Sequence, residues 1–142
     1  MGDSGWSEAE KAAMKERAEE LRAERGGKKK ADALADLLAK VAEMPDDERV
    51  MAERLHSLVT KAAPQLEPRT WYGMPAWSLD GKVLCFFQPA TKFESRYSTF
   101  GFQDVAQLDD GAMWPASFAL VWLGAEEERA LAELVKRAVG SA

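Results

Sequence analysis

The aromatic residues of this chain are concentrated in its middle. Twelve of the thirteen lie between Trp71 and Trp122, whereas the segments on either side are rich in alanine and charged residues. Aromatic side chains favour strands, and alanine, leucine, glutamate and lysine favour helices. The chain is therefore expected to form a sheet in its middle, with helices before and after it.

Three helices are predicted before the aromatic segment. Ser7 followed by Glu10 has the spacing of a capping box, which predicts a helix over residues 7–25. Apolar residues at helical spacing predict a second helix over residues 30–43 and a third that begins after Pro45, with Asp46 as its cap. The first helix has only a thin stripe of small apolar residues, so we expect it to be loosely attached.

The aromatic segment itself predicts four or five antiparallel strands. Asp80-Gly81 favours a type I′ turn, because both residues tolerate the positive φ that this turn requires, and it predicts a hairpin. The predicted strands span residues 70–72, 76–78, 82–87, 95–102 and 118–123.

A closing helix is predicted after Gly124, where three consecutive glutamates complement the positive end of the helix dipole. A run of strands flanked by helices indicates an α+β fold, with an antiparallel sheet of four to five strands, helices packed on one face, and an N-terminal helical extension. We assign the extension to residues 1–44 and the α+β domain to residues 45–142.

Strand alternation predicts that both faces of the sheet are apolar. Val83, Cys85 and Phe87 should point to one face, and Leu84 and Phe86 to the other. If helices cover one face, the other must be closed by loops, by the N-terminal helices, by a second subunit or around a ligand.

Composition excludes several classes of function. A net charge of -5 argues against nucleic-acid binding, and the short basic cluster Lys28–Lys30 is interpreted as an interhelix loop. The sequence has no apolar run long enough to span a membrane and no signal-like N-terminus, which predicts a cytoplasmic protein. Cys85 is the one cysteine, so an internal disulfide or a thiolate zinc cluster is excluded.

The sequence does not predict catalysis. His56 is the only histidine and has no evident nucleophile or orienting partner. Cys85 lies in a predicted strand, where a buried thiol behaves as a small apolar group. No glycine-rich phosphate loop is present.

Acidic residues near the start of the third helix offer a weak metal site. Asp46, Asp47, Glu48 and Glu53 carry the oxygen ligands that hard cations prefer, although they lack the spacing of a calcium-binding loop. Asp46 is also explained as a helix-start residue. A weak, exposed acidic patch is the expectation.

The aromatic segment offers a second candidate site. Tyr72, Met74, Trp77, Lys92 and Tyr97 combine rings, a flexible thioether and a cation, which suits a pocket for a small ligand. The alternative is that these side chains are ordinary core residues, since aromatic strands commonly build cores.

The chain resembles the YdhG-like family of small bacterial domains from about residue 46 to its end. The residues that carry the resemblance are Ala62-Ala63-Pro64, Tyr72-Gly73-Met74-Pro75-Ala76, Asp80-Gly81-Lys82, Phe86-Phe87 and Lys92. Further likeness to one branch of the family comes from Arg69-Thr70-Trp71-Tyr72, Arg96-Tyr97, Phe100-Gly101-Phe102 and the stretch Leu108 to Pro115.

The resemblance implies an α+β fold with an antiparallel sheet, in a soluble cytoplasmic protein. Some members of the family are described as frataxin-like iron chaperones, which makes iron a possible cargo for the acidic residues near Asp46. Many members have a histidine directly after the lysine equivalent to Lys92. This chain has Phe93 there, which argues against a metal role at that position.

These observations lead to a non-enzymatic binding module as the first hypothesis, with iron handling as one form of it. The first alternative is a small-molecule or enzymatic pocket in the aromatic segment. The second is an interaction or homodimerisation module formed by the N-terminal helices or by an open face of the sheet.

Overall fold

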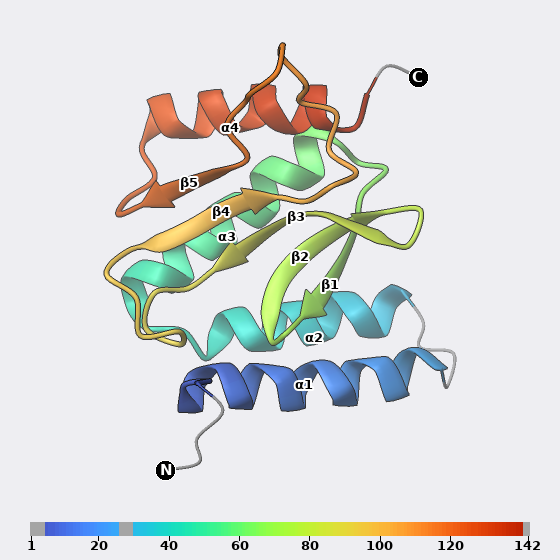
Figure 1. Cartoon of the computed structure of the whole chain (residues 1–142), viewed down its shortest axis with the longest axis vertical. Coiled ribbons are helices and arrows are strands. Elements are labelled where there is room, and N and C mark those ends of the chain that lie inside the picture. Colours follow the sequence, from blue (N-terminus) through green and yellow to red (C-terminus); the bar gives the residue numbers. More distant parts are fainter. Residues whose placement is uncertain (1–4, 26–29, 141–142) are drawn as a thin grey trace.

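The computed structural model describes residues 5–25 and 30–140. Four helices and five strands follow one another in the described chain (Figure 1). In order they are α1 (Glu8–Arg25), α2 (Lys30–Ala42), α3 (Asp46–Ala62), β1 (Glu67–Trp71), β2 (Met74–Leu79), β3 (Lys82–Gln88), β4 (Ser98–Phe102), β5 (Ser117–Leu120) and α4 (Ala125–Ala138).

The strands form one antiparallel sheet in the order β1-β2-β3-β4-β5, which confirms the predicted α+β class. The last predicted strand is shorter than expected: β5 ends at Leu120, and Val121 and Trp122 turn outward with 81% and 47% of their surface exposed. The strand predicted over residues 95–102 begins only at Ser98.

The helix starts follow local capping. Ser7 and Glu10 form the predicted capping box, with Ser7 N donating to Glu10 Oε1 (2.8 Å) and Glu10 N donating to Ser7 Oγ (3.0 Å). The prediction that Asp46 caps α3 is wrong. Pro45 occupies the cap position and Asp46 is the first helical residue, so its charge acts on the helix dipole rather than as a cap.

Two tight turns shape the first three strands. Asp80 and Gly81 have φ angles of 50° and 82°, as predicted for the hairpin between β2 and β3. Tyr72 and Gly73, at 54° and 74°, form a second turn of the same kind between β1 and β2, in place of the strand residue predicted at Tyr72.

Strict alternation fails at Leu84. The register pairs Trp77 with Cys85 and Ser78 with Val83, so Leu84 is an extra residue in β3. As a result Leu84 and Cys85 both join the main core, although they are adjacent in sequence. Alternation predicted these two residues on opposite faces of the sheet, whereas the bulge places both in the main core.

The core lies between the sheet and the helices α2, α3 and α4. Its largest fully buried side chains include Trp77, Phe87 and Phe100 from the sheet. Leu37 and Val41 of α2 belong to the same cluster, so α2 shares this core. The division of the chain at residue 44 stays a prediction.

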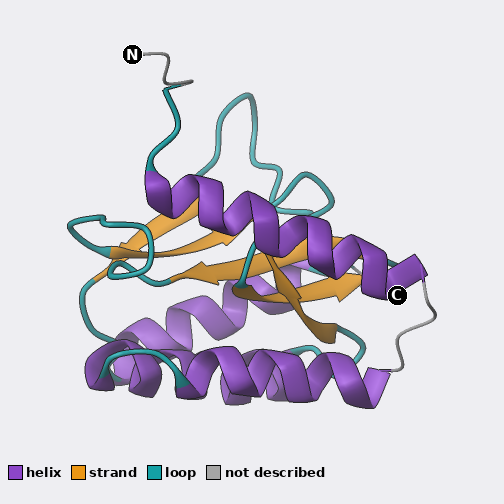
Figure 2. Cartoon of the chain, turned by 90° about the horizontal axis from the view of Figure 1, so that it is seen from below, coloured by secondary structure: helices purple, strands orange, loops and turns teal. Residues whose placement is uncertain are grey.

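Helix α1 lies across the sheet from α2, beside the β1 end (Figure 2). Ala13 is its one buried residue among those described, in keeping with the thin apolar stripe. None of the helices in the described ranges is long and apolar enough to cross a membrane. Lys28 and Lys29 of the basic cluster lie outside the described residues.

Candidate functional site

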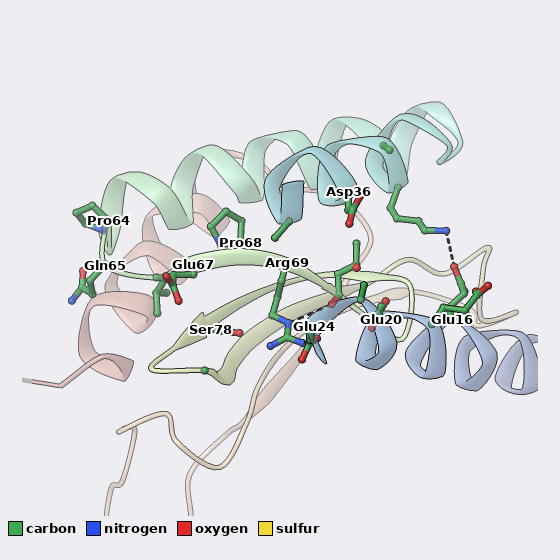
Figure 3. A pocket seen from close by; sticks show the side chains of 18 residues that line it. Glu16, Glu20, Glu24, Asp36, Pro64, Gln65, Glu67, Pro68, Arg69 and Ser78 are labelled. Atoms are coloured by element: carbon green, nitrogen blue, oxygen red, sulfur yellow. Dashed lines mark hydrogen bonds and ion pairs between the residues drawn. The ribbon is translucent and has the colours of Figure 1, made fainter. Parts of the chain in front are cut away.

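A cavity of about 850 Å³ lies at the β1 edge of the sheet, where α1 and α2 approach from two sides (Figure 3). One face of α1 lines it, with Glu16, Glu19, Glu20, Ala23 and Glu24 at helical spacing. Further walls come from α2, from the segment that leads into β1, from β1 itself and from Ser78 of β2. The cavity thus depends on contacts between distant parts of the chain.

Glu20 fastens α1 to the first hairpin. Its two carboxylate oxygens accept hydrogen bonds from the backbone N–H groups of Tyr72 and Gly73, both at 3.0 Å. A turn with two positive φ angles exposes adjacent N–H groups, and a carboxylate is well suited to accept both. These two hydrogen bonds hold α1 next to the β1–β2 turn.

Glu16 joins three elements through two ion pairs. It accepts hydrogen bonds from Lys40 of α2 at 2.7 Å and from Lys92, which follows β3, at 2.6 Å. Burial alone would raise the pKa of the Glu16 carboxyl, but the two lysines outweigh burial and hold that pKa below its usual value. The hydrogen bond to Glu16 likewise raises the pKa of Lys40.

Glu24 completes a row of carboxylates four residues apart. Arg69 of β1 pairs with Glu24, and Arg17 bridges Glu20 and Glu24 at 3.2 Å each. Arg17 also lies over the Tyr72 ring, 5.9 Å from its centroid. The attachment of α1 is therefore mainly electrostatic, with little apolar burial.

Ser78 is the polar group in the cavity wall that the protein leaves unsatisfied. It is 2% exposed, and its Oγ has no hydrogen-bond partner among the described residues. Ser78 lies on β2, in the wall of the cavity shown in Figure 3. Ser98 in β4 is equally buried, yet its Oγ accepts a hydrogen bond from Ala90 N at 3.0 Å.

This pair of serines allows a matched test. Ser98→Ala should lower the free energy of unfolding by about 1–2 kcal/mol, because it leaves the Ala90 N–H without its acceptor. Ser78→Ala should change it by less than about 0.5 kcal/mol or raise it, because it removes an unpaired buried hydroxyl. Urea denaturation measures both values, and equal losses would show that Ser78 Oγ is bonded within the protein.

The five residues predicted to bind a ligand do not line this cavity. Tyr72 forms the β1–β2 turn and Lys92 pairs with Glu16, so these two reach the carboxylate row of α1 from outside the cavity. Met74 and Trp77 are buried, and Tyr97 is 37% exposed beside Arg96. A ligand site made by these five residues stays a prediction.

The four residues predicted as metal ligands either contact other protein groups or are exposed. Arg49 pairs with Asp46 (3.3 Å) and with Glu53 (3.5 Å). Glu48 accepts hydrogen bonds from Thr91 N and Oγ1, and Asp47 is exposed. Within the described part of the chain, no group of three or more His, Cys, Asp or Glu residues is arranged to hold a metal ion. Iron binding stays a prediction.

His56 contacts the core residue Trp77, and Cys85 belongs to the core. His56 Nδ1 accepts a hydrogen bond from Trp77 Nε1 at 3.2 Å, and burial lowers the pKa of His56, which favours the neutral ring that this bond requires. Cys85 is fully buried, and burial raises the pKa of its thiol well above the usual value. Cys85 therefore has no surface that a bound molecule could reach, and His56 Nδ1 is already hydrogen-bonded to Trp77.

Sequence reasoning missed the residues that line the cavity. Glu16, Glu20 and Glu24 are four residues apart, so the sequence alone could have indicated a row of carboxylates on one face of α1. No local signal distinguishes Ser78, because its lack of a partner depends on the fold. Comparison with protein-family models, with curated proteins and with solved structures found no match to this chain.

Proposed function

We propose that this protein is a non-enzymatic binding module and that its ligand occupies the cavity between α1, α2 and β1. The observation that carries the proposal is the cavity itself, which has about 850 Å³ and is walled by elements from distant parts of the chain.

The size and wall chemistry of the cavity support the same proposal. Small-molecule sites commonly have volumes of about 300–1,000 Å³, with apolar walls and a few converging polar groups. The cavity has about 850 Å³, and Leu66, Pro64 and Pro68 contribute apolar wall beside the carboxylates of α1. Membership of the YdhG-like family remains part of this proposal, and rests on the sequence motifs alone.

Nuclear magnetic resonance titration tests the location of the site. Uniformly ¹⁵N-labelled protein is titrated with small cationic, anionic and neutral molecules. At least one compound should produce saturable shifts of amides in the cavity wall. The diagnostic amides are those of Glu19, Leu66, Arg69, Ser78 and Gly81.

One result would count against this location. Saturable shifts confined to Tyr72, Met74, Trp77, Lys92 and Tyr97 would assign binding to the aromatic segment instead.

A further inference from the structure

We infer that the surface on which α1 docks is a binding site for an acidic helix of a partner protein, and that α1 competes with this partner by occupying the site. The inference goes beyond the proposed function, because it concerns the contacts that hold α1 and not the cavity beside them. It follows from the donors that the docking surface offers, from the carboxylates that α1 places on them, and from the small apolar contact of α1.

The docking surface of α1 consists of three cationic side chains and two backbone N–H groups. Lys40 belongs to α2, Arg69 belongs to β1, and Lys92 follows β3. The N–H groups of Tyr72 and Gly73 point toward α1 from the β1–β2 turn. Adjacent N–H groups in a turn form a small concavity that binds anions. Five donors suited to anions therefore meet on this surface, although they come from separate parts of the chain.

Within the described part of the chain, α1 supplies every ion-pair partner of these three cations. Lys40 and Lys92 both pair with Glu16, at 2.7 and 2.6 Å, and Arg69 pairs with Glu24. The two N–H groups of the turn bond to a third carboxylate of the same helix. If α1 left, all five donors would lose these carboxylates, and the surface would present unpaired positive charge to any acidic helix.

The spacing of the carboxylates defines the kind of ligand. Glu16, Glu20 and Glu24 follow one another at intervals of four residues, which is a rise of about 6 Å per step along a helix. Figure 3 shows the three side chains in a row along α1, with Arg69 reaching Glu24. A helix with glutamates at positions i, i+4 and i+8 matches all the donors of the surface, whereas one small anion would satisfy only one of the three positions.

The attachment of α1 is of a kind that a partner can replace. Ala13 is the one buried residue among those described in α1, and the larger apolar side chains Met14 and Leu21 are 39% and 37% exposed. The ion pairs that hold the helix are only partly buried, and pairs that solvent reaches contribute little and are screened by salt. A partner helix that combines the same carboxylates with greater apolar burial would therefore displace α1.

Fluorescence anisotropy tests the inference with a labelled peptide that has the sequence of residues 7–25 and stands in for an acidic helix. In the full-length double variant Glu16→Gln/Glu20→Gln, the chain's own α1 docks more weakly and leaves the surface open more often. The double variant should therefore bind the peptide about tenfold more tightly than the wild type does. A peptide with glutamine in place of Glu16, Glu20 and Glu24 should bind neither protein.

Glu8→Gln/Glu19→Gln is the matched control, since it removes two charges from exposed positions of α1. It should bind the peptide no more tightly than the wild type. Adding Lys92→Gln to Glu16→Gln/Glu20→Gln should weaken peptide binding about threefold, as expected for a partly exposed ion pair. Equal gains in the two double variants would overturn the inference, because they would indicate only reduced repulsion. A failure of Glu16→Gln/Glu20→Gln to bind the peptide would overturn it as well.

The amides of Tyr72 and Gly73 locate the bound peptide. Their resonances should move in Glu16→Gln/Glu20→Gln and return toward the wild-type positions when the peptide is added, because a carboxylate again accepts both N–H groups. Resonances that stay at the variant positions while the peptide binds would overturn the inference. Sedimentation of the wild type as a dimer that Glu16→Gln/Glu20→Gln dissociates would also overturn it, because the occupant would then be α1 of a second copy.

Discussion

Trp77→Ala is expected to lower the free energy of unfolding by about 3–5 kcal/mol, the range for removal of a large aromatic side chain from a packed core. Trp77 has no exposed surface, and its ring packs near Phe100 with centroids 6.4 Å apart. The substitution also leaves His56 Nδ1 without the N–H that it accepts. Urea denaturation followed by circular dichroism measures the loss.

Trp122→Ala is the matched control, because it removes the same side chain from the surface. Trp122 is 47% exposed and lies beside Arg54, whose guanidinium is 5.7 Å from the ring centroid. Its loss should cost no more than about 1 kcal/mol. A similar cost for both substitutions would contradict the assignment of Trp77 to the core and would reopen a role for it in a pocket.

This contrast shows what the aromatic pattern could and could not predict. The concentration of rings located the sheet correctly, because aromatic side chains favour strands. The pattern did not separate Trp77, which faces α3, from Trp122, which follows the end of β5. That difference depends on strand register and on where β5 ends, and both are set by tertiary contacts.

Local sequence signals predicted a turn only where both of its central residues tolerate positive φ. Asp80-Gly81 was recognisable because glycine and aspartate tolerate positive φ. The turn at Tyr72-Gly73 was not recognised, because tyrosine rarely adopts a φ of 54°. In the folded chain this turn is supported by Glu20, which is separated from it by more than fifty residues.

The sequence could not predict the cavity, because residues far apart in the chain form its wall. Its wall is assembled by pairs such as Glu24 with Arg69 and Glu16 with Lys92, which are 45 and 76 residues apart. Helical periodicity shows that Glu16, Glu20 and Glu24 share a face of α1, but it cannot show what that face meets. Their partners become identifiable only when the hairpin and α1 are placed together.

Gly73→Ala tests this long-range assembly and is expected to lower the free energy of unfolding by about 2–3 kcal/mol. Gly73 has a φ of 74°, where a Cβ atom costs about 1–2 kcal/mol. A Cβ at this position would also lie 2.6 Å from Cδ of Glu16. The carboxylate must then move and weaken its pairs with Lys40 and Lys92, each worth up to about 1 kcal/mol at this exposure.

Gly81→Ala separates the cost of backbone strain from the cost of displacing Glu16. Gly81 occupies the same position of the second hairpin with a φ of 82°, but a Cβ there meets no atom within 4 Å. It should cost only the backbone strain, about 1 kcal/mol. In a Glu16→Ala background the cost of Gly73→Ala should fall to that of Gly81→Ala, because the side chain that obstructs the new methyl group is gone.

Gly73→Ala also connects the stability of the fold to the proposed site. Because α1 is held by Glu16, Glu20 and Glu24 rather than by apolar burial, displacing Glu16 should loosen one wall of the cavity. Gly73→Ala should therefore weaken the binding of any compound that shifts the amides of the cavity wall. The titration repeated on Gly73→Ala would decide, and unchanged binding would mean that the cavity does not depend on how α1 is docked.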